Sequence, residues 1–308
     1  MTLGIDITGI YSRYFSSVQV LMASVIPLVV LLVLFCFFKM SSNPRARSRS
    51  LGMMMLFSIF FWLFIGLSLI VCYALSESYE YQPEVAVRTA FGFTIMLALV
   101  SGLPLSFLLR RYSPRIVLNR VKDLSPPRAD LAVSFLSLSR KMMVTNAELK
   151  VSRNTLPVSF AIDDHKPVVV ISEKLLSLLK EDEVEAVLAH ELAHVKNSDT
   201  ALKAMVTAYK TALPQDPVIR LVEAAFHRER EIVADETAAR ATQKPLSLAS
   251  ALLKIYEAFP KNNLRSYGTL SILGGGTTLM SRHPPITHRI NQLIHLAEVY
   301  GVTAAPTP

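Results

Sequence analysis

The chain of 308 residues contains only two cysteines, and their scarcity excludes two classes of protein. A small secreted domain stabilised by disulfide bonds needs several paired cysteines, and a zinc module built on cysteine ligands needs closely spaced cysteines. Cys36 and Cys72 each lie inside a long apolar stretch, so they fit neither pattern. A cleavable signal peptide is not expected either, because only one cation, Arg13, precedes the first apolar run.

Charge is missing from three long runs, residues 14–38, 50–76 and 89–109. Each run is longer than the roughly 20 residues that cross the apolar layer of a bilayer. Three such runs in succession are hard to bury in a soluble core, so we expect three transmembrane helices rather than core helices. The chain then divides into a membrane anchor at 1–110, a C-terminal domain at 111–300 and a disordered tail at 301–308.

The cations are distributed unevenly around these runs. Between the first two runs the chain carries Lys39, Arg45, Arg47 and Arg49. The next connection carries three glutamates and one arginine, namely Glu77, Glu80, Glu84 and Arg88. Five cations follow the third run: Arg110, Arg111, Arg115, Arg120 and Lys122. The positive-inside rule therefore predicts a multi-pass protein of the cell membrane with its N-terminus outside and the domain at 111–300 in the cytoplasm. Anionic lipid is the nearer partner for these cations, and no nucleic-acid partner is expected.

The sequence His190-Glu191-Leu192-Ala193-His194 is an HExxH motif. Residues four apart are neighbours on a helix, so both imidazoles can bind one Zn²⁺, and Glu191 can act as general base on a water molecule beside them. Val184, Val187, Leu188, Leu192 and Val195 recur at helical spacing and predict that helix. Asp182 and Glu185, three apart, resemble a capping box at its start.

A third ligand is expected from a second predicted helix, at about Val218 to Ala241. Glu231 and Asp235 share a face of this helix, because they are four residues apart. We assign Glu231 as the third zinc ligand and Asp235 as the acceptor that orients a histidine through its other ring nitrogen. The alternative is a solvated, charge-rich helix face, which suits Glu229 and Arg230 better than Glu231.

Four blocks of sequence together resemble the HtpX-like and CAAX prenyl protease-like family of membrane zinc metallopeptidases. They are Val168 to Asp199, the EIVAD block at 231–235, Leu246 to Ile255 and Arg282 to Ile290. The resemblance implies a multi-pass α-helical membrane anchor, followed by a mainly α (α+β) gluzincin metallopeptidase domain with a small edge-strand sheet. It also implies one Zn²⁺ per chain, a catalytic His283 that stabilises the oxyanion, and an Arg289 that supports the ligands from behind.

The segment Lys166 to Ser172 is rich in β-branched residues and predicts a strand. The resemblance implies that a sheet-edge strand near Val168–Ser172, beside the zinc helix, binds polypeptide substrate by strand addition. Members of the family usually carry an NAFA-like segment just before this strand. The corresponding residues are Val158-Ser159-Phe160-Ala161, which lack the asparagine.

Many HtpX relatives place transmembrane helices between the histidines and the glutamate. Residues 201–226 contain Lys203, Lys210, Pro214, Asp216 and Arg220, so a full span is not expected there. The segment Ala201 to Leu213 could rest on the membrane surface, or it could be an ordinary amphipathic helix.

The function predicted from these features is zinc-dependent endoproteolysis of membrane-associated or misfolded proteins, as in HtpX-like quality control. One alternative is a gated signalling metalloprotease of the antibiotic-sensor type, which shares HExxH and has no spans before the third ligand. The other alternative is a non-catalytic zinc-binding membrane scaffold. Loss of catalysis usually removes a ligand or the base, but both histidines, the base and the carboxylate are all present. The sequence sets no oligomeric state and no cleavage preference.

Overall fold

A computed structural model describes residues 17–74, 92–97, 100–101, 104–105, 107–108, 112, 123–153, 156–162, 166–197, 199–214, 216–258 and 284–301. Nine of the 21 residues of the third apolar run (89–109), His283 and the tail after Gly301 lie outside these residues.

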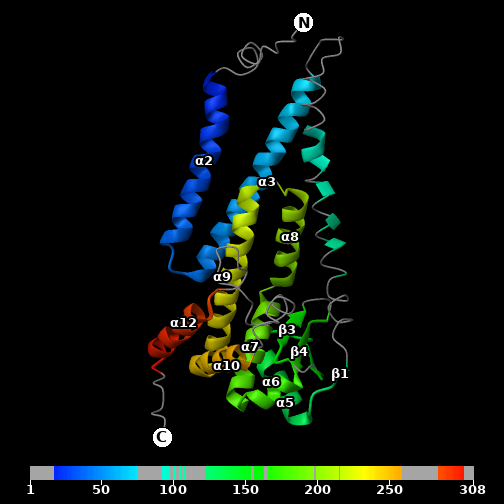
Figure 1. Cartoon of the computed structure of the whole chain (residues 1–308), viewed down its shortest axis with the longest axis vertical. Coiled ribbons are helices and arrows are strands. Elements are labelled where there is room, and N and C mark those ends of the chain that lie inside the picture. Colours follow the sequence, from blue (N-terminus) through cyan, green and yellow to red (C-terminus); the bar gives the residue numbers. More distant parts are fainter. Residues whose placement is uncertain are drawn as a thin grey trace.

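The described part of the chain is mostly helical and elongated, with two long N-terminal helices at one end and a small sheet with its helices at the other (Figure 1). The N-terminal helices are α2 (Ser17–Met40) and α3 (Pro44–Ala74). The strands are β1 (Leu124–Ser125), β2 (Glu148–Ser152), β3 (Ser159–Ile162) and β4 (Val168–Ser172). The other helices are α5 (Ala129–Lys141), α6 (Glu173–Leu178), α7 (Glu181–Lys196), α8 (Asp199–Ala212), α9 (Pro217–Thr242), α10 (Pro245–Ala258) and α12 (Ile286–Val299).

Helices α2 and α3 cover the first two apolar runs. Among the residues searched, Pro44–Gly66 is the one helical segment long and apolar enough to cross a membrane, and a shorter apolar segment covers Val29–Met40. The cations predicted to lie in a loop are instead helical, since only residues 41–43 separate α2 from α3. Asn43 caps α3 by accepting a hydrogen bond from the backbone N–H of Arg45, so the helix starts before its first arginine.

The sheet has the order β1-β2-β4-β3. Strand β4 forms at the predicted position, and all five of its residues are buried. The prediction that it lies at the sheet edge is wrong, because β4 pairs with β2 in parallel and with β3 antiparallel. Both of its backbone edges are occupied, so it cannot accept a further strand. Strand β3 has one described neighbour and packs against α7.

Helix α7 is the centre of the main apolar core. It forms over the predicted residues and buries Val187, Leu188 and Leu192 against the sheet and the surrounding helices. Four alanines fill the same core, Ala189 and Ala193 from α7 and Ala234 and Ala238 from α9. Their small side chains let the two helices pack closely, and this packing sets where their polar residues meet.

The start of α7 is capped differently from the prediction. The helix begins at Glu181, and Glu183, at its third position, accepts a hydrogen bond from the backbone N–H of Lys180 at 2.8 Å. Asp182 and Glu185 face outward and both bind Lys244, at 2.7 and 2.6 Å. The predicted capping pair is therefore two residues out of register, since the observed pair is Lys180 and Glu183.

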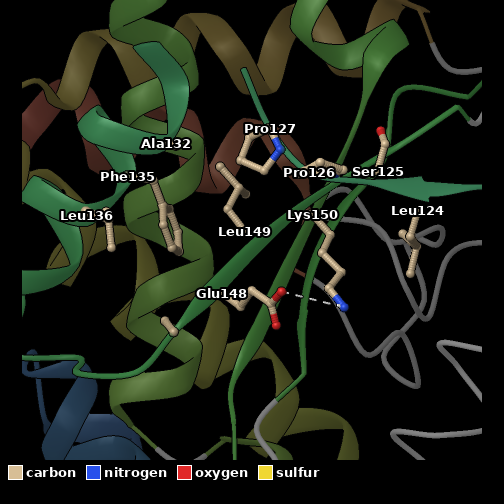
Figure 2. Close-up of a pocket in the computed structure, with 11 residues that line it drawn as sticks. Leu124, Ser125, Pro126, Pro127, Ala132, Phe135, Leu136, Glu148, Leu149 and Lys150 are labelled. Carbon is tan, nitrogen blue, oxygen red and sulfur yellow. Dashed lines mark ion pairs between the residues drawn. The ribbon is translucent and has the colours of Figure 1, made fainter. Parts of the chain in front are cut away.

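A hollow of about 450 Å³ lies between α5 and the β1–β2 side of the sheet (Figure 2). It is lined by Pro126, Pro127, Phe135, Leu149 and their neighbours, and Glu148 pairs with Lys150 at its rim at 3.8 Å. No residue of the HExxH motif lines it.

Glu183 provides a pH-dependent test of the core. Burial tends to raise the pKa of its carboxyl group, but hydrogen bonds from Lys254, the Lys180 backbone and Ser250 outweigh burial and lower it. A lowered folded-state pKa stabilises the fold above the unfolded pKa of about 4.3, and this contribution is lost as the pH falls through the folded value. Glu183→Gln should therefore destabilise the protein by about 1–2 kcal/mol at pH 7 in thermal unfolding.

The control is Glu181→Gln, which changes an exposed carboxylate in the same helical turn and should have a much smaller effect. The deficit of Glu183→Gln should shrink at a pH below both pKa values. A deficit of equal size at low pH would contradict this account.

Candidate metal centre and active site

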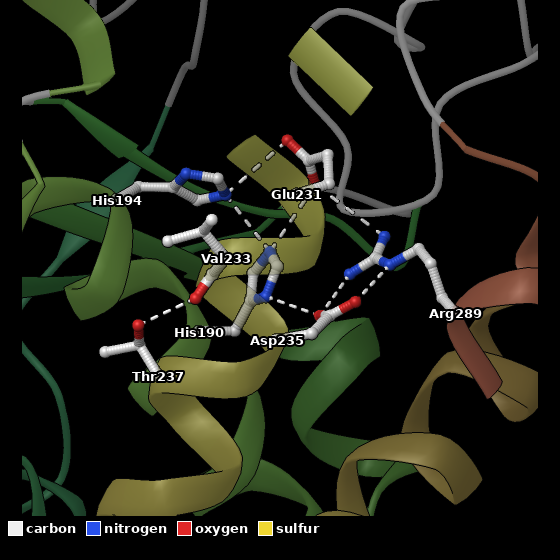
Figure 3. A network of polar contacts seen from close by, with 7 residues as sticks. All are labelled: His190, His194, Glu231, Val233, Asp235, Thr237 and Arg289. Carbon is white, nitrogen blue, oxygen red and sulfur yellow. Dashed lines mark hydrogen bonds and ion pairs between the residues drawn. The ribbon is translucent and has the colours of Figure 1, made fainter. Parts of the chain in front are cut away.

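The two histidines of the motif lie on one face of α7. His190 and His194 are one turn apart, and their Nε2 atoms are 3.1 Å from each other (Figure 3). The His190 side chain is buried, whereas the side chain of His194 is 12% exposed. The pair is therefore open to its surroundings on the His194 side.

Helix α9 brings a carboxylate to the same point. Glu231 places Oε2 at 3.6 Å from His190 Nε2 and Oε1 at 3.6 Å from His194 Nε2. Among the described residues, these three form the one group of histidine, cysteine or acidic side chains with metal-binding geometry, and their ligand atoms all lie within 4.8 Å of one another.

The spacing fits a tetrahedral zinc ion. Zinc binds nitrogen and carboxylate oxygen at about 2.0–2.2 Å, so two ligands of a tetrahedral site are separated by about 3.3–3.5 Å. The observed separations of 3.1, 3.6 and 3.6 Å lie around this value. Two imidazoles and one carboxylate leave a fourth position open, as catalytic zinc sites require.

Asp235 lies behind the first histidine. Its Oδ1 is 2.9 Å from His190 Nδ1, so the ring nitrogen that faces away from Glu231 has an acceptor. Such an acceptor fixes the tautomer in which Nε2 is free to bind a metal.

Arg289 of α12 holds Asp235 in turn. It donates from Nε to Oδ2 at 2.7 Å and from Nη2 to Oδ1 at 2.6 Å, a two-pronged ion pair that is fully buried. Its Nη1 lies 3.7 Å from Glu231 Oε2, so one guanidinium contacts both acids of α9 (Figure 3).

The charges of this cluster are strongly coupled. Burial alone would lower the pKa of His190, but hydrogen bonds to Asp235 and Glu231 outweigh burial and raise it to about 9. Burial would raise the pKa of Asp235, yet the neighbouring Arg289 lowers it. The pKa of Arg289 is raised, because Asp235, Glu231 and Glu191 together outweigh its burial.

The donor set therefore suits a divalent cation. Glu191, Glu231 and Asp235 are three buried carboxylates, while Arg289 supplies one buried positive charge, which leaves an excess of two negative charges beside neutral histidines. A Zn²⁺ ion would balance this excess. The raised pKa of His190 has the same origin, since a proton is the cation that an imidazole can take up from these acids.

The structure thus brings together His190, His194, Glu231, Asp235 and Arg289. Glu191 is buried beside them on α7 and close enough to influence the pKa of Arg289. His283 lies outside the described residues, two positions before Pro285, which precedes α12.

The sequence interpretation placed Glu229 and Arg230 on a solvated helix face, but in the structure both make specific contacts. Glu229 is buried and pairs with Arg47 of α3 at 2.6 Å, so it is not solvated. Arg230 donates from Nη2 to the backbone oxygen of Asn197, at the end of α7, at 3.0 Å. No local pattern could have shown these contacts, because both partners lie far away in the sequence.

Comparison with known proteins supports this assignment. The family model for the BlaR1 peptidase M56 matches residues 75–271. A protease HtpX homologue of Desulforapulum autotrophicum is 30% identical over 254 residues, which cover 65% of this chain and 81% of that protein. One from Methanopyrus kandleri is 36% identical over 171 residues, 43% of this chain and 54% of the relative, so the alignment spans about half of that protein.

Among solved structures, Ste24p of S. mikatae matches with a TM-score of 0.45 and 14% identity, over 82% of this chain and 67% of Ste24p. This likeness is too distant to assign a shared fold. The family model and the HtpX homologues are sufficient without it: the chain belongs to the M56 peptidase family and is an HtpX-like membrane zinc protease.

Proposed function

We propose that the protein is a zinc-dependent endopeptidase that cleaves polypeptides at the membrane surface. The observation that carries this proposal is the convergence of His190, His194 and Glu231 within 4.8 Å, beside the buried Glu191. In this assignment the three converging residues are the ligands of one Zn²⁺, and the fold around them is that of a gluzincin.

Bound zinc supplies a Lewis acid that polarises the scissile carbonyl and acidifies water. Glu191 takes a proton from the attacking water and passes it to the leaving amine, which completes peptide hydrolysis. Asp235 holds the ring of His190, and Arg289 holds Asp235, so the imidazole keeps its orientation throughout the cycle. For His283 we keep the proposal from family resemblance, stabilisation of the oxyanion.

Substrate backbone is proposed to add to β3. The backbone N–H of Ser172 donates to Val158 O, so hydrogen-bonded pairs between β3 and β4 fall at Val158, Phe160 and Ile162. The backbone groups of Ser159 and Ala161 then point to the other edge, where no described strand pairs. Strand β3 itself packs against α7. An extended peptide added there would run beside the HExxH helix.

The membrane arrangement is part of the proposal. The apolar helices α2 and α3, with the third apolar run, support a multi-pass anchor. The arginines at the start of α3 support a cytoplasmic location for the metal centre. Proteins with unfolded or juxtamembrane segments near the bilayer are then the most accessible substrates, which agrees with a role in quality control.

A second candidate is a gated signalling protease. It is favoured by the match of residues 75–271 to a family model named for BlaR1. Such an enzyme would hold zinc but cleave only when its membrane helices change state. Activity of the purified protein towards an unfolded substrate separates the two candidates.

Glu191→Gln tests the proposed chemistry. The amide cannot accept the proton of water, so hydrolysis of casein by detergent-purified protein should fall by about 10²–10⁴-fold. Glu191 is not among the proposed ligands, so zinc content should match that of the wild type. The measurements are casein cleavage and metal analysis on both proteins.

Glu181→Gln, an exposed carboxylate at the other end of α7, should retain full activity as the control. Equal cleavage by Glu191→Gln and wild type would refute Glu191 as the base. Zinc without cleavage in the wild type would favour the gated candidate, and a wild type that binds no zinc would overturn the metal site.

Ala161→Pro tests substrate binding at β3. Proline removes the N–H that points away from β4 and leaves the hydrogen bonds between β3 and β4 in place. We expect kcat/KM for casein to fall about tenfold, mainly through a higher KM, with unchanged zinc content and thermal stability. An unchanged KM in a folded variant would show that substrate binds elsewhere.

A further inference from the structure

Three consecutive residues of α9 bind three different partners. Glu229 pairs with Arg47 of α3, Arg230 binds the backbone oxygen of Asn197 after α7, and Glu231 reaches His190 and His194. Residues two apart on a helix are separated by about 200° around its axis. Glu229 and Glu231 therefore leave α9 on opposite sides, one towards the membrane helix and the other towards the metal site.

The carboxylate of the Arg47–Glu229 ion pair is buried, whereas the Arg47 side chain is 27% exposed. Arg47 Nη2 lies 2.6 Å from Glu229 Oε1, and the glutamate side chain is 4% exposed. Its other oxygen, Oε2, has no hydrogen-bond partner among the described residues. Without Arg47 this buried carboxylate would lack its partner of opposite charge, which is strongly unfavourable.

A second contact joins α3 and α9 at the N-terminus of α9. Asp216 precedes α9 and is buried; its Oδ1 accepts hydrogen bonds from the backbone N–H groups of Val218 and Ile219. Its Oδ2 accepts from Ser58 Oγ at 2.5 Å and from Trp62 Nε1 at 3.0 Å, both on α3. The N-terminus of α9 is thus capped and bound to α3 by one carboxylate.

The two contacts are a similar distance apart on both helices. At 1.5 Å per residue, Asp216 and Glu229 are about 20 Å apart along α9, and Arg47 lies about 17–23 Å from Ser58 and Trp62 along α3. The helices lie side by side over this length (Figure 1), with Met54, Met55, Val222 and Phe226 in one apolar cluster between them. Two fixed points restrain both the sliding and the rotation of α9.

We propose that Arg47 of the membrane helix is a positioning residue for the metal site: by holding Glu229, it sets the rotation of α9 that presents Glu231 to the two histidines. This inference rests on the proposed zinc site. The first turn of α3 would then help to form the metal site of the protease, in addition to belonging to the membrane anchor. Loss of Arg47 would free α9 to turn, and Glu231 would move away from His190 and His194.

The test measures zinc affinity by competition with a chelator, together with kcat and KM on casein, in detergent-purified full-length protein. Arg47→Met should weaken zinc binding about tenfold and lower kcat about tenfold, with KM within about twofold of wild type. Arg47→Lys keeps the charge and should stay within about threefold of wild type in zinc affinity. Arg45→Met, an exposed arginine two residues away, should change neither quantity.

A double variant, Arg47→Met with Glu229→Gln, removes the unpaired buried charge without restoring the ion pair, so its zinc affinity should stay about tenfold below that of the wild type. If a thermal melt shows that Arg47→Met does not fold, the double variant still tests the positioning role of Arg47. Wild-type zinc affinity and kcat in Arg47→Met would overturn the positioning role while leaving the protease assignment intact, and so would wild-type zinc affinity in the double variant. A wild type that binds no zinc would overturn both.

Discussion

The close packing of α7 against α9 is the constraint on which the rest of the structure depends. Ala189 and Ala193 belong to the same buried cluster as Ala234 and Ala238, and small side chains where two helices pack allow the backbones to approach. Only with that approach can a carboxylate of α9 reach two imidazoles of α7. The sheet, α10 and α12 pack around this pair, and α3 supports α9 from the membrane side.

Buried charge makes the centre costly unless it is balanced. Two of the three buried carboxylates have partners of opposite charge or strong donors: Asp235 has Arg289 and His190, while Glu231 lies near Arg289 and both histidines. Although burial lowers the pKa of His190, hydrogen bonds to Asp235 and Glu231 raise it to about 9. A divalent cation would balance the remaining excess of negative charge. Metal binding and stability of the folded state are therefore coupled, since the acids are brought together only when the chain folds.

The parts of the site that follow from helix geometry could be predicted from the sequence. The spacing of His190 and His194 is local, and the four-residue interval between Glu231 and Asp235 put both on one face of a helix whose bounds were correct to within a residue. Contacts between distant segments could not be predicted in the same way. Strand β4 was identified but its neighbours were not, because pairing depends on the whole sheet, and Glu229 seemed solvated because its partner, Arg47, lies on another helix.

The central claim is that two imidazoles and one carboxylate hold a single zinc ion. X-ray absorption at the zinc edge of the purified, zinc-loaded protein tests it most directly. The account predicts one Zn²⁺ per chain with two histidine nitrogens and light oxygen or nitrogen donors at about 2.0–2.2 Å, and loss of one histidine contribution in His194→Ala. A sulfur ligand, or a spectrum unaffected by His194→Ala, would contradict it.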